Sequence, residues 1–267
     1  MPSVAMRPYL AIARISWRSA LAYRIPFVLS LCMMVFNLLA MLSLWRVLLA
    51  SGHPLAGFTW PEMRAYLLVS FVTGCLVSSF TDFTMAFRIQ SGLVALDLTQ
   101  PVHYQRARFA QCLGMTVLES ATAAVVCGAA LAAFGAIPVP ALPQLALFLV
   151  SLVAVVPLKF LIVYSSGLLC FWTHNYLGVS FARAAVSAVL SGALVPLVFF
   201  PGWLRILAEV LPFQGIASTP ALIYLGQASG WDAVRLIGIQ LLWIAVLWAG
   251  ASAAWNAALR RLTIHGG

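Results

Sequence analysis

The chain has 267 residues, of which 63% are hydrophobic and only 8% are charged. A soluble domain carries roughly 25% charged residues, so this composition excludes a water-soluble globular protein and makes lipid the solvent for most of the chain. The formal net charge of +9 does not indicate a nucleic-acid binder, because the basic residues lie between apolar runs and not together on one polar face.

The first element in chain order is an interfacial helix within residues 1–25. At helical spacing Arg7, Arg14 and Arg18 fall in one narrow stripe, with Tyr9 and Ile12 roughly opposite. Such a pattern favours a short helix that lies in the cytoplasmic interface with its arginines towards lipid phosphates.

Six later runs have the roughly 20 predominantly apolar residues that a membrane-spanning helix needs. Their approximate limits are Phe27–Leu49, Tyr66–Phe87, Ala110–Phe134, Leu142–Phe171, Val179–Phe200 and Ala233–Ala257. The sequence therefore predicts an all-α integral membrane protein with six transmembrane helices. We expect a single membrane domain over 1–267, with spans one to five in 26–200 and span six in 232–260.

The basic residues predict the orientation of these spans. With the N-terminus in the cytoplasm, ten arginines fall on the inner side and only four on the outer side, which are Arg46, Arg64, Arg205 and Arg235. This bias satisfies the positive-inside rule. Six spans then place both termini in the cytoplasm.

The segment 201–231, between the last two spans, is rich in proline and glycine yet contains many apolar side chains. An exposed loop would be polar. We expect short helices that enter the outer leaflet and return, a re-entrant segment that is tolerated only where protein buries the backbone or water reaches it. The alternative is an outer loop folded over the helix ends.

Charged residues inside a span cost about 2.5–3.5 kcal/mol each at mid-helix, and the predicted spans contain three clear cases. They are Asp82, Glu119 and Lys159. Glu119 and Lys159 fall at similar depths on adjacent antiparallel spans, and we expect them to face each other, either as a structural pair or across a hydrated cavity with a functional role. No spacing of cysteine and histidine indicates a metal site, since the five cysteines all lie in apolar runs.

The loop after the second predicted span carries a short amphipathic stretch, in which Leu93, Leu96 and Leu98 are apolar. A simple connector has no need of these leucines, whereas a helix that docks a soluble partner does. The loop has the pattern Ile-x-x-Gly-Leu…Leu-x-x-Pro, formed by Ile89, Gly92, Leu93, Leu98 and Pro101.

This pattern resembles the permeases of the type-two ATP-binding-cassette (ABC) exporter superfamily, over essentially the whole chain. Supporting marks are the residues 196–204, the Leu-Pro-Phe of 211–213, Pro220 and Gly226. Relatives often carry a basic residue at the position of Gln90, where this chain departs from the pattern.

The resemblance implies a permease subunit, not an enzyme, in a bacterial cytoplasmic membrane. Such permeases work as two membrane subunits, a second copy or a related permease, with a dimer of separate ATPase subunits that binds ATP and Mg²⁺. ATP binding closes the ATPase pair, which pushes on short cytoplasmic helices. The coupling loop would comprise Arg88, Ile89, Gly92, Leu93, Asp97, Leu98 and Pro101, and the outer re-entrant region would comprise Phe199, Pro201, Trp203, Pro212, Phe213 and Pro220.

The sequence independently supports one of these implications, that the ATPase is a separate chain. It contains no G-x-x-x-x-G-K-[ST] loop to hold phosphates, so an ATPase would have to be another chain, and no cofactor is expected on this one. We expect export of a hydrophobic or amphipathic substrate. One alternative is an ion-coupled secondary transporter that uses Asp82, Glu119 and Lys159. The others are a structural subunit and an intramembrane enzyme, although this chain lacks the clustered acidic residues that such an enzyme needs.

Overall fold

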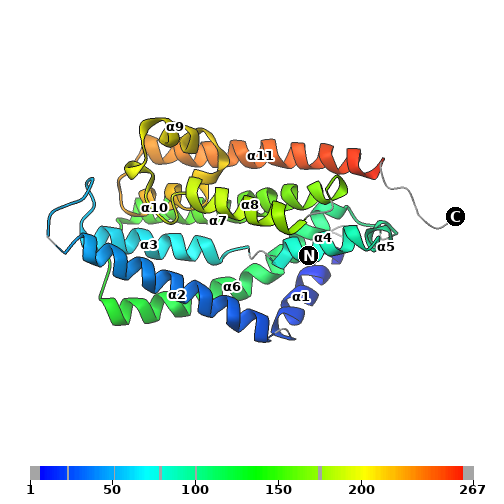
Figure 1. The fold of residues 1–267 in the computed structure, drawn as a ribbon, viewed down its shortest axis with the longest axis horizontal. Coiled ribbons are helices and arrows are strands. Elements are labelled where there is room, and N and C mark those ends of the chain that lie inside the picture. Colours follow the sequence, from blue (N-terminus) through cyan, green and yellow to red (C-terminus); the bar gives the residue numbers. More distant parts are fainter. Residues whose placement is uncertain are drawn as a thin grey trace.

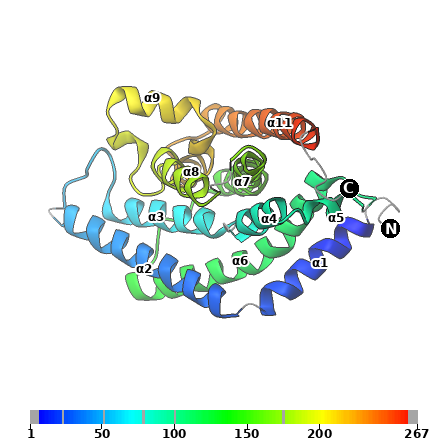
Figure 2. The ribbon, with the colours of Figure 1, turned by 45° about the vertical axis from the view of Figure 1, so that its right-hand side comes forward.

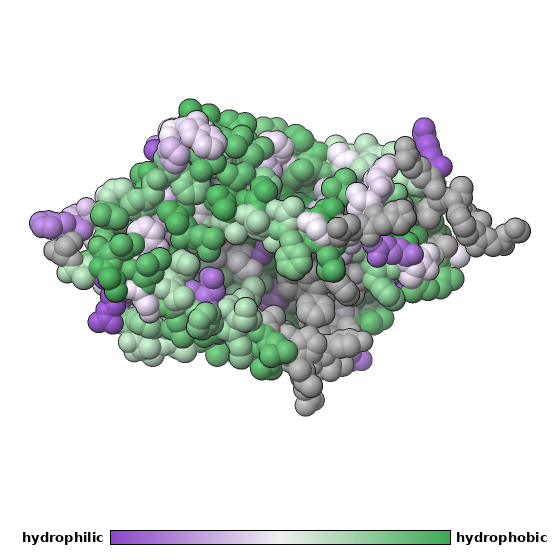
Figure 3. Space-filling view, in the orientation of Figure 1, coloured by the Kyte–Doolittle hydropathy of each residue, from purple (hydrophilic) through white to green (hydrophobic). Residues whose placement is uncertain are grey.

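The computed structural model describes residues 7–22, 24–50, 52–77, 80–99, 101–173 and 176–260. Helices take up 80% of these residues and no β-strand occurs among them, so the predicted all-α class is confirmed. The long helices run side by side along the long axis of the molecule (Figure 1). The surface of the middle is mainly apolar, and hydrophilic residues gather towards the two ends (Figure 3), as expected of a protein whose middle lies in lipid.

Four helical segments of the described residues have the length and hydropathy of membrane spans. They correspond to the first, third, fourth and sixth predicted spans. The helix that corresponds to the third predicted span, α6, has 31 residues and is therefore about 46 Å long. This length is enough to cross the hydrocarbon core and continue beyond it. The four segments are Leu31–Leu48 within α2 (Arg24–Leu48), α6 (Tyr104–Phe134), Leu142–Phe171 formed by α7 (Leu142–Leu168) and the 3₁₀ turn η2 (Leu169–Phe171), and α11 (Trp231–Leu259).

The second predicted span, 66–87, is not one helix. α3 (Trp60–Cys75) ends in its middle, and a separate helix, α4 (Phe80–Gln90), continues the run. The chain leaves the helical conformation at Leu76, whose ψ is 139°, and at Val77, whose φ is +55°. Because a β-branched residue rarely adopts a positive φ, the surrounding structure and not local preference must hold this break.

The fifth predicted span, 179–200, is helical only as far as Leu190, within α8 (Tyr176–Leu190). Gly192 follows with a φ of +76°, and its carbonyl accepts a hydrogen bond of 2.8 Å from the Tyr66 hydroxyl. A Cβ at Gly192 would lie 2.9 Å from that hydroxyl. The contact with α3 thus requires glycine where α8 ends.

The segment between α8 and α11 forms four short helices. Residues 214–221 are buried throughout, and the last of the short helices packs on α7 and α3. The structure buries residues 214–221 of this predicted apolar, proline-broken segment against the bundle, whereas most of 202–210 is exposed. The short helices are η3 (Leu197–Phe199), α9 (Gly202–Val210), η4 (Pro212–Gly215) and α10 (Ser218–Tyr224).

The first helix, α1 (Arg7–Ala22), packs along α6 (Figure 2). The two backbones approach most closely where Gly114 of α6 meets Ala13 of α1. A Cβ built on Gly114 would overlap the Ala13 carbonyl group, with only 2.9 Å to its carbon. Arg7, Arg14 and Arg18 are exposed, as an interfacial helix requires.

We expect Gly114→Ala to separate α1 from α6, because the added methyl group meets backbone that cannot rotate away. Overpacking of this kind costs about 1–3 kcal/mol, so the thermal unfolding midpoint of the protein in detergent should fall. Gly128→Ala on the same helix is the matched control, since a Cβ there meets nothing within 4 Å. An equal midpoint for both variants would contradict the close α1–α6 packing.

Candidate functional site

Within the predicted coupling loop, residues 94–98 form one short helix, α5 (Val94–Leu98), between α4 and α6, while Arg88 and Ile89 lie in the last turn of α4. It lies at one end of the molecule, and α9 lies at the other (Figure 1). The turn from α4 into α5 uses Gly92, whose φ is +73°. Val94 is fully buried and packs in the aromatic cluster that contains Tyr104 and Phe160. One face of α5 is therefore anchored in the protein.

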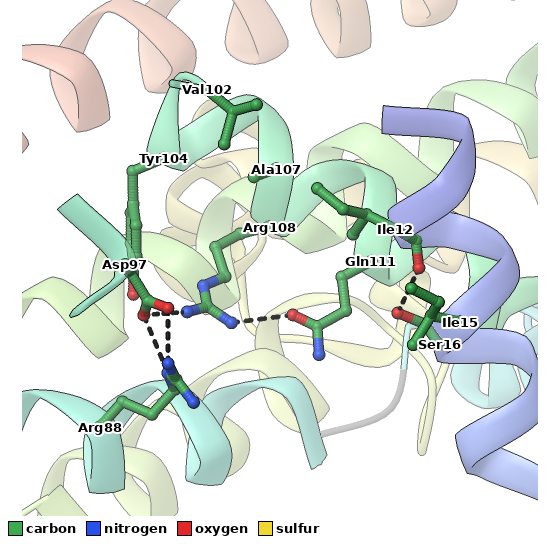
Figure 4. Close-up of a pocket in the computed structure, with 10 residues that line it drawn as sticks. All are labelled: Ile12, Ile15, Ser16, Arg88, Asp97, Val102, Tyr104, Ala107, Arg108 and Gln111. Carbon is green, nitrogen blue, oxygen red and sulfur yellow. Dashed lines mark hydrogen bonds and ion pairs between the residues drawn. The ribbon is translucent and has the colours of Figure 1, made fainter. Parts of the chain in front are cut away.

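Asp97 of α5 joins three helices through ion pairs. Its Oδ1 lies 2.5 Å from Nη2 of Arg88 in α4, and its Oδ2 lies 2.5 Å from Nη2 of Arg108 in α6. Nε of Arg88 also donates to Oδ2 at 2.8 Å. Figure 4 shows both guanidinium groups converging on this carboxylate. Hydrogen bonding to Asp97 raises the pKa of Arg88, which keeps the guanidinium protonated.

We call these ion pairs of Asp97 with Arg88 and Arg108 the Asp97 clamp. Two of the predicted coupling residues, Arg88 and Asp97, therefore have partners within the chain. The side chains of Asp97 and Arg108 are only 11% and 12% exposed, and that of Arg88 is 33% exposed. Sequence reasoning grouped Arg88 and Asp97 with the partner-contacting residues but omitted Arg108. The signal for Arg108 was its place in the same polar stretch, eleven residues after Asp97.

The other face of α5 is apolar and exposed. Leu93, Leu96 and Leu98 all reach solvent, and Leu96 is 60% exposed. Of the remaining predicted loop residues, Pro101 is exposed and Ile89 is half-buried. A row of exposed leucines beside an internal ion-pair clamp is a rigid apolar surface, and a surface of this kind is typical of a docking element.

A second group of polar contacts surrounds the break between α3 and α4. Nζ of Lys159 in α7 donates hydrogen bonds to the carbonyl oxygens of Thr73, at 3.2 Å, of Gly74, at 2.6 Å, and of Leu76. These carbonyls lie at the C-terminal end of α3, where no further turn of helix supplies N–H donors. A cation at this end also interacts favourably with the helix dipole. Lys159 therefore acts as the cap of α3.

Glu119 lies near Lys159 but is not among the described hydrogen-bond acceptors of its ammonium. The Glu119 carboxylate is buried, and its negative charge acts on Lys159 together with the positive charge of Arg183 in α8. The structure adds carbonyl groups as partners of the Lys159 ammonium, and the pairing of Glu119 with Lys159 stays a prediction. Arg183 was counted only as a topology-setting residue, and its place about one turn inside the apolar run 179–200 was the missed signal. The Asp82 side chain lies outside the described residues.

Arg64 of α3 caps another helix end in the same way, at the far end of the bundle. Its two Nη atoms donate to the carbonyl oxygens of Phe134 and Ala136, where α6 ends. α3 itself begins there with a capping box, in which Glu62 Oε2 accepts from the Thr59 N–H at 2.8 Å. Sequence reasoning used Arg64 only to count charges.

Gln240 of α11 ties the short-helix segment to the long helices. Its Nε2 donates to the carbonyl of Gly215 at 2.7 Å, and its Oε1 accepts from the Ser151 hydroxyl at 3.0 Å. Gln240 is 1% exposed. A glutamine inside the apolar run 233–257 was the sequence signal for this contact, and it was missed.

The predicted outer-region residues do not share one environment. The Phe199 ring packs against Trp45, with 5.2 Å between centroids, whereas Trp203 is exposed on α9. Pro212 and Pro220 are buried in η4 and α10, Phe213 is half-buried, and Pro201 is exposed. Within the described ranges no group of histidine, cysteine and acidic residues could hold a metal ion.

Comparison with known proteins provides one match. The family model described as ABC-2 family transporter protein matches residues 31–266, which run from within α2 to beyond the end of α11 and therefore cover most of the chain. No curated protein and no solved structure matches it.

We expect Lys159→Met to destabilise the protein, because the carbonyls at the end of α3 would lose their donor inside an apolar bundle. Each stranded acceptor costs on the order of 1–3 kcal/mol, so the unfolding midpoint in detergent should fall by at least about 5 °C. Adding Glu119→Gln should not restore it, since the carbonyls remain stranded. A double variant as stable as the wild type would show that Lys159 serves Glu119 and not α3.

Proposed function

Since this chain belongs to the ABC-2 family of transporter proteins, we propose that it is the membrane-spanning permease subunit of an ATP-driven exporter. The family implies a membrane component that works with an ABC ATPase. The observation that carries the proposal is α5, a short helix at one end of the bundle with Leu93, Leu96 and Leu98 exposed. These leucines offer an apolar surface to a soluble ATPase subunit.

The Asp97 clamp supports a coupling role for α5. Because Asp97 joins Arg88 of α4 and Arg108 of α6, a push on α5 reaches both helices through charged contacts. α4 is separated from α3 by the break at Leu76 and Val77, so it can move without bending one long helix. Force applied at the leucines would pass along α4 towards the middle of the membrane.

ATP and Mg²⁺ are proposed to bind to the partner ATPase. The 267 residues contain no G-x-x-x-x-G-K-[ST] sequence, and the backbone N–H groups of such a loop are what hold the phosphates of ATP. The chain then contributes the path for the substrate, and a dimer of ATPase subunits contributes hydrolysis.

For the membrane arrangement we propose six crossings in a bacterial cytoplasmic membrane, with both termini in the cytoplasm. α3 and α4 together would form the second crossing, and α8 with residues 191–200 the fifth. The placement of α5 and the end of α11 at one end of the molecule, and of α9 at the other, supports this orientation (Figure 1). Burial of residues 214–221 against the bundle supports a re-entrant outer segment over 201–231.

A hydrophobic or amphipathic substrate is supported by a cavity of ≈300 Å³ between α2 and α3. Met33, Met34 and Met41 line it, together with Phe71. Methionine side chains adapt to ligands of different shapes. A substrate path in such permeases is completed by a second membrane subunit, so we propose a second copy or a related permease beside this chain.

We expect Leu96→Asp to prevent capture of the ATPase without lowering the unfolding midpoint, because Leu96 is 60% exposed and already faces solvent. The measurement is recovery of an ATPase with a G-x-x-x-x-G-K-[ST] loop, by mass spectrometry, after gentle detergent extraction of the tagged chain from its host.

Leu55→Asp is the matched control, since Leu55 is 41% exposed in the loop at the opposite end of the molecule. It should retain the ATPase. If the wild-type chain captures no ATPase even after crosslinking, the exporter proposal fails. If Leu96→Asp captures as much as the wild type, α5 is not the docking element.

A further inference from the structure

A cavity of ≈340 Å³ lies between α1, α5 and the first turns of α6. One wall is polar and contains the Asp97 clamp together with Gln111, which accepts from Arg108 Nη1 at 2.9 Å. The opposite wall belongs to α1 and presents Ile12 and Ile15 (Figure 4). A cavity with one cationic wall and one apolar wall fits an amphipathic anion.

The polar wall carries one positive charge in excess. Two guanidinium groups, Arg88 and Arg108, share the single carboxylate of Asp97, and among the described residues no other charged side chain lines the cavity. Each guanidinium keeps N–H donors that its described hydrogen bonds do not use. A ligand with one negative charge would make this wall neutral.

The position of the cavity indicates which kind of singly charged anion would bind there. α1 is the interfacial helix, with Arg7, Arg14 and Arg18 exposed, so the cavity opens where lipid headgroups meet water. A phospholipid phosphodiester has one negative charge next to acyl chains. Guanidinium groups bind phosphate oxygens with well-matched geometry, and basic pockets between helices on the cytoplasmic side of a membrane suit anionic headgroups.

We propose that this cavity binds the phosphodiester headgroup of an anionic phospholipid from the cytoplasmic leaflet. The phosphate would contact Arg88 and Arg108, and an acyl chain would lie along Ile12 and Ile15. The bound lipid would join α1 to the Asp97 clamp, and so make the stiffness of the coupling element depend on lipid composition. The inference rests on the proposed membrane arrangement but not on any ATPase or transport activity.

The test measures lipid binding directly. The full chain is purified in detergent, stripped of lipid, and titrated with dioleoyl phosphatidylglycerol or dioleoyl phosphatidylcholine, with native mass spectrometry as the readout. We expect phosphatidylglycerol to bind at least tenfold more tightly. Arg108→Gln, which removes the excess charge, and Ala107→Phe, which fills the cavity and keeps the Asp97 clamp, should each weaken that binding at least fivefold.

Arg205→Gln is the matched control, because Arg205 is also paired with an acidic residue, Glu209, but lies on α9 at the other end. It should bind phosphatidylglycerol as the wild type does. Glycerophosphoglycerol, the same diester without acyl chains, identifies the source of the ligand: competition at equal concentration means a soluble phosphodiester, and failure to compete means a lipid.

Competition would overturn the phospholipid and leave only a site for a soluble phosphodiester, whereas failure to compete supports the proposal. Equal affinity for the two lipids would overturn the proposal. Unchanged binding by Ala107→Phe would also overturn it, whatever Arg108→Gln does. Because neither readout involves an ATPase, a failure here leaves the permease assignment standing.

Discussion

The last carbonyl groups of a helix have no partner within that helix, and the interior of a bilayer offers no water to replace one. α3 has 16 residues and so extends for only about 24 Å, which ends it inside the apolar bundle. Lys159 supplies the missing donors from α7 and spares the carbonyls a large desolvation cost. Arg64 does the same for α6, and Gln240 for the carbonyl of Gly215. Broken helices are stable here because long polar side chains from neighbouring helices reach their ends.

This arrangement divides the second crossing into two parts with different attachments. α3 is held by the Lys159 cap and by the contact of Tyr66 with Gly192. α4 is held at its far end by the Asp97 clamp. The break at Val77 lies between them. On the proposed function, α3 would belong with the substrate path and α4 with the ATPase partner, and the break between them would let the two parts move relative to each other.

Much of this molecule can be read from the sequence. The apolar runs predicted an all-α membrane protein, and the loop motif predicted the family, and both are confirmed. The sequence showed that a charge at Lys159 is unusual, but it did not show which groups accept its hydrogen bonds. The acceptors are backbone carbonyls, which every residue has, and a carbonyl is available only where a helix ends. The break at Leu76 and Val77 was also hidden, since the apolar run continues through it. Asp97 was assigned to the partner surface because sequence spacing does not reveal that Arg88 and Arg108 converge on it.

We propose that α5 and the loop before α3 lie on opposite sides of the membrane, with α5 in the cytoplasm. The most direct measurement uses single cysteines at Leu96 and Leu55 in a chain whose five native cysteines are replaced. Right-side-out spheroplasts are treated with a membrane-impermeant maleimide before and after permeabilisation. We expect Leu55→Cys to react in intact spheroplasts and Leu96→Cys to react only after permeabilisation. Reaction of both cysteines from the same side, or the reverse order, would contradict it.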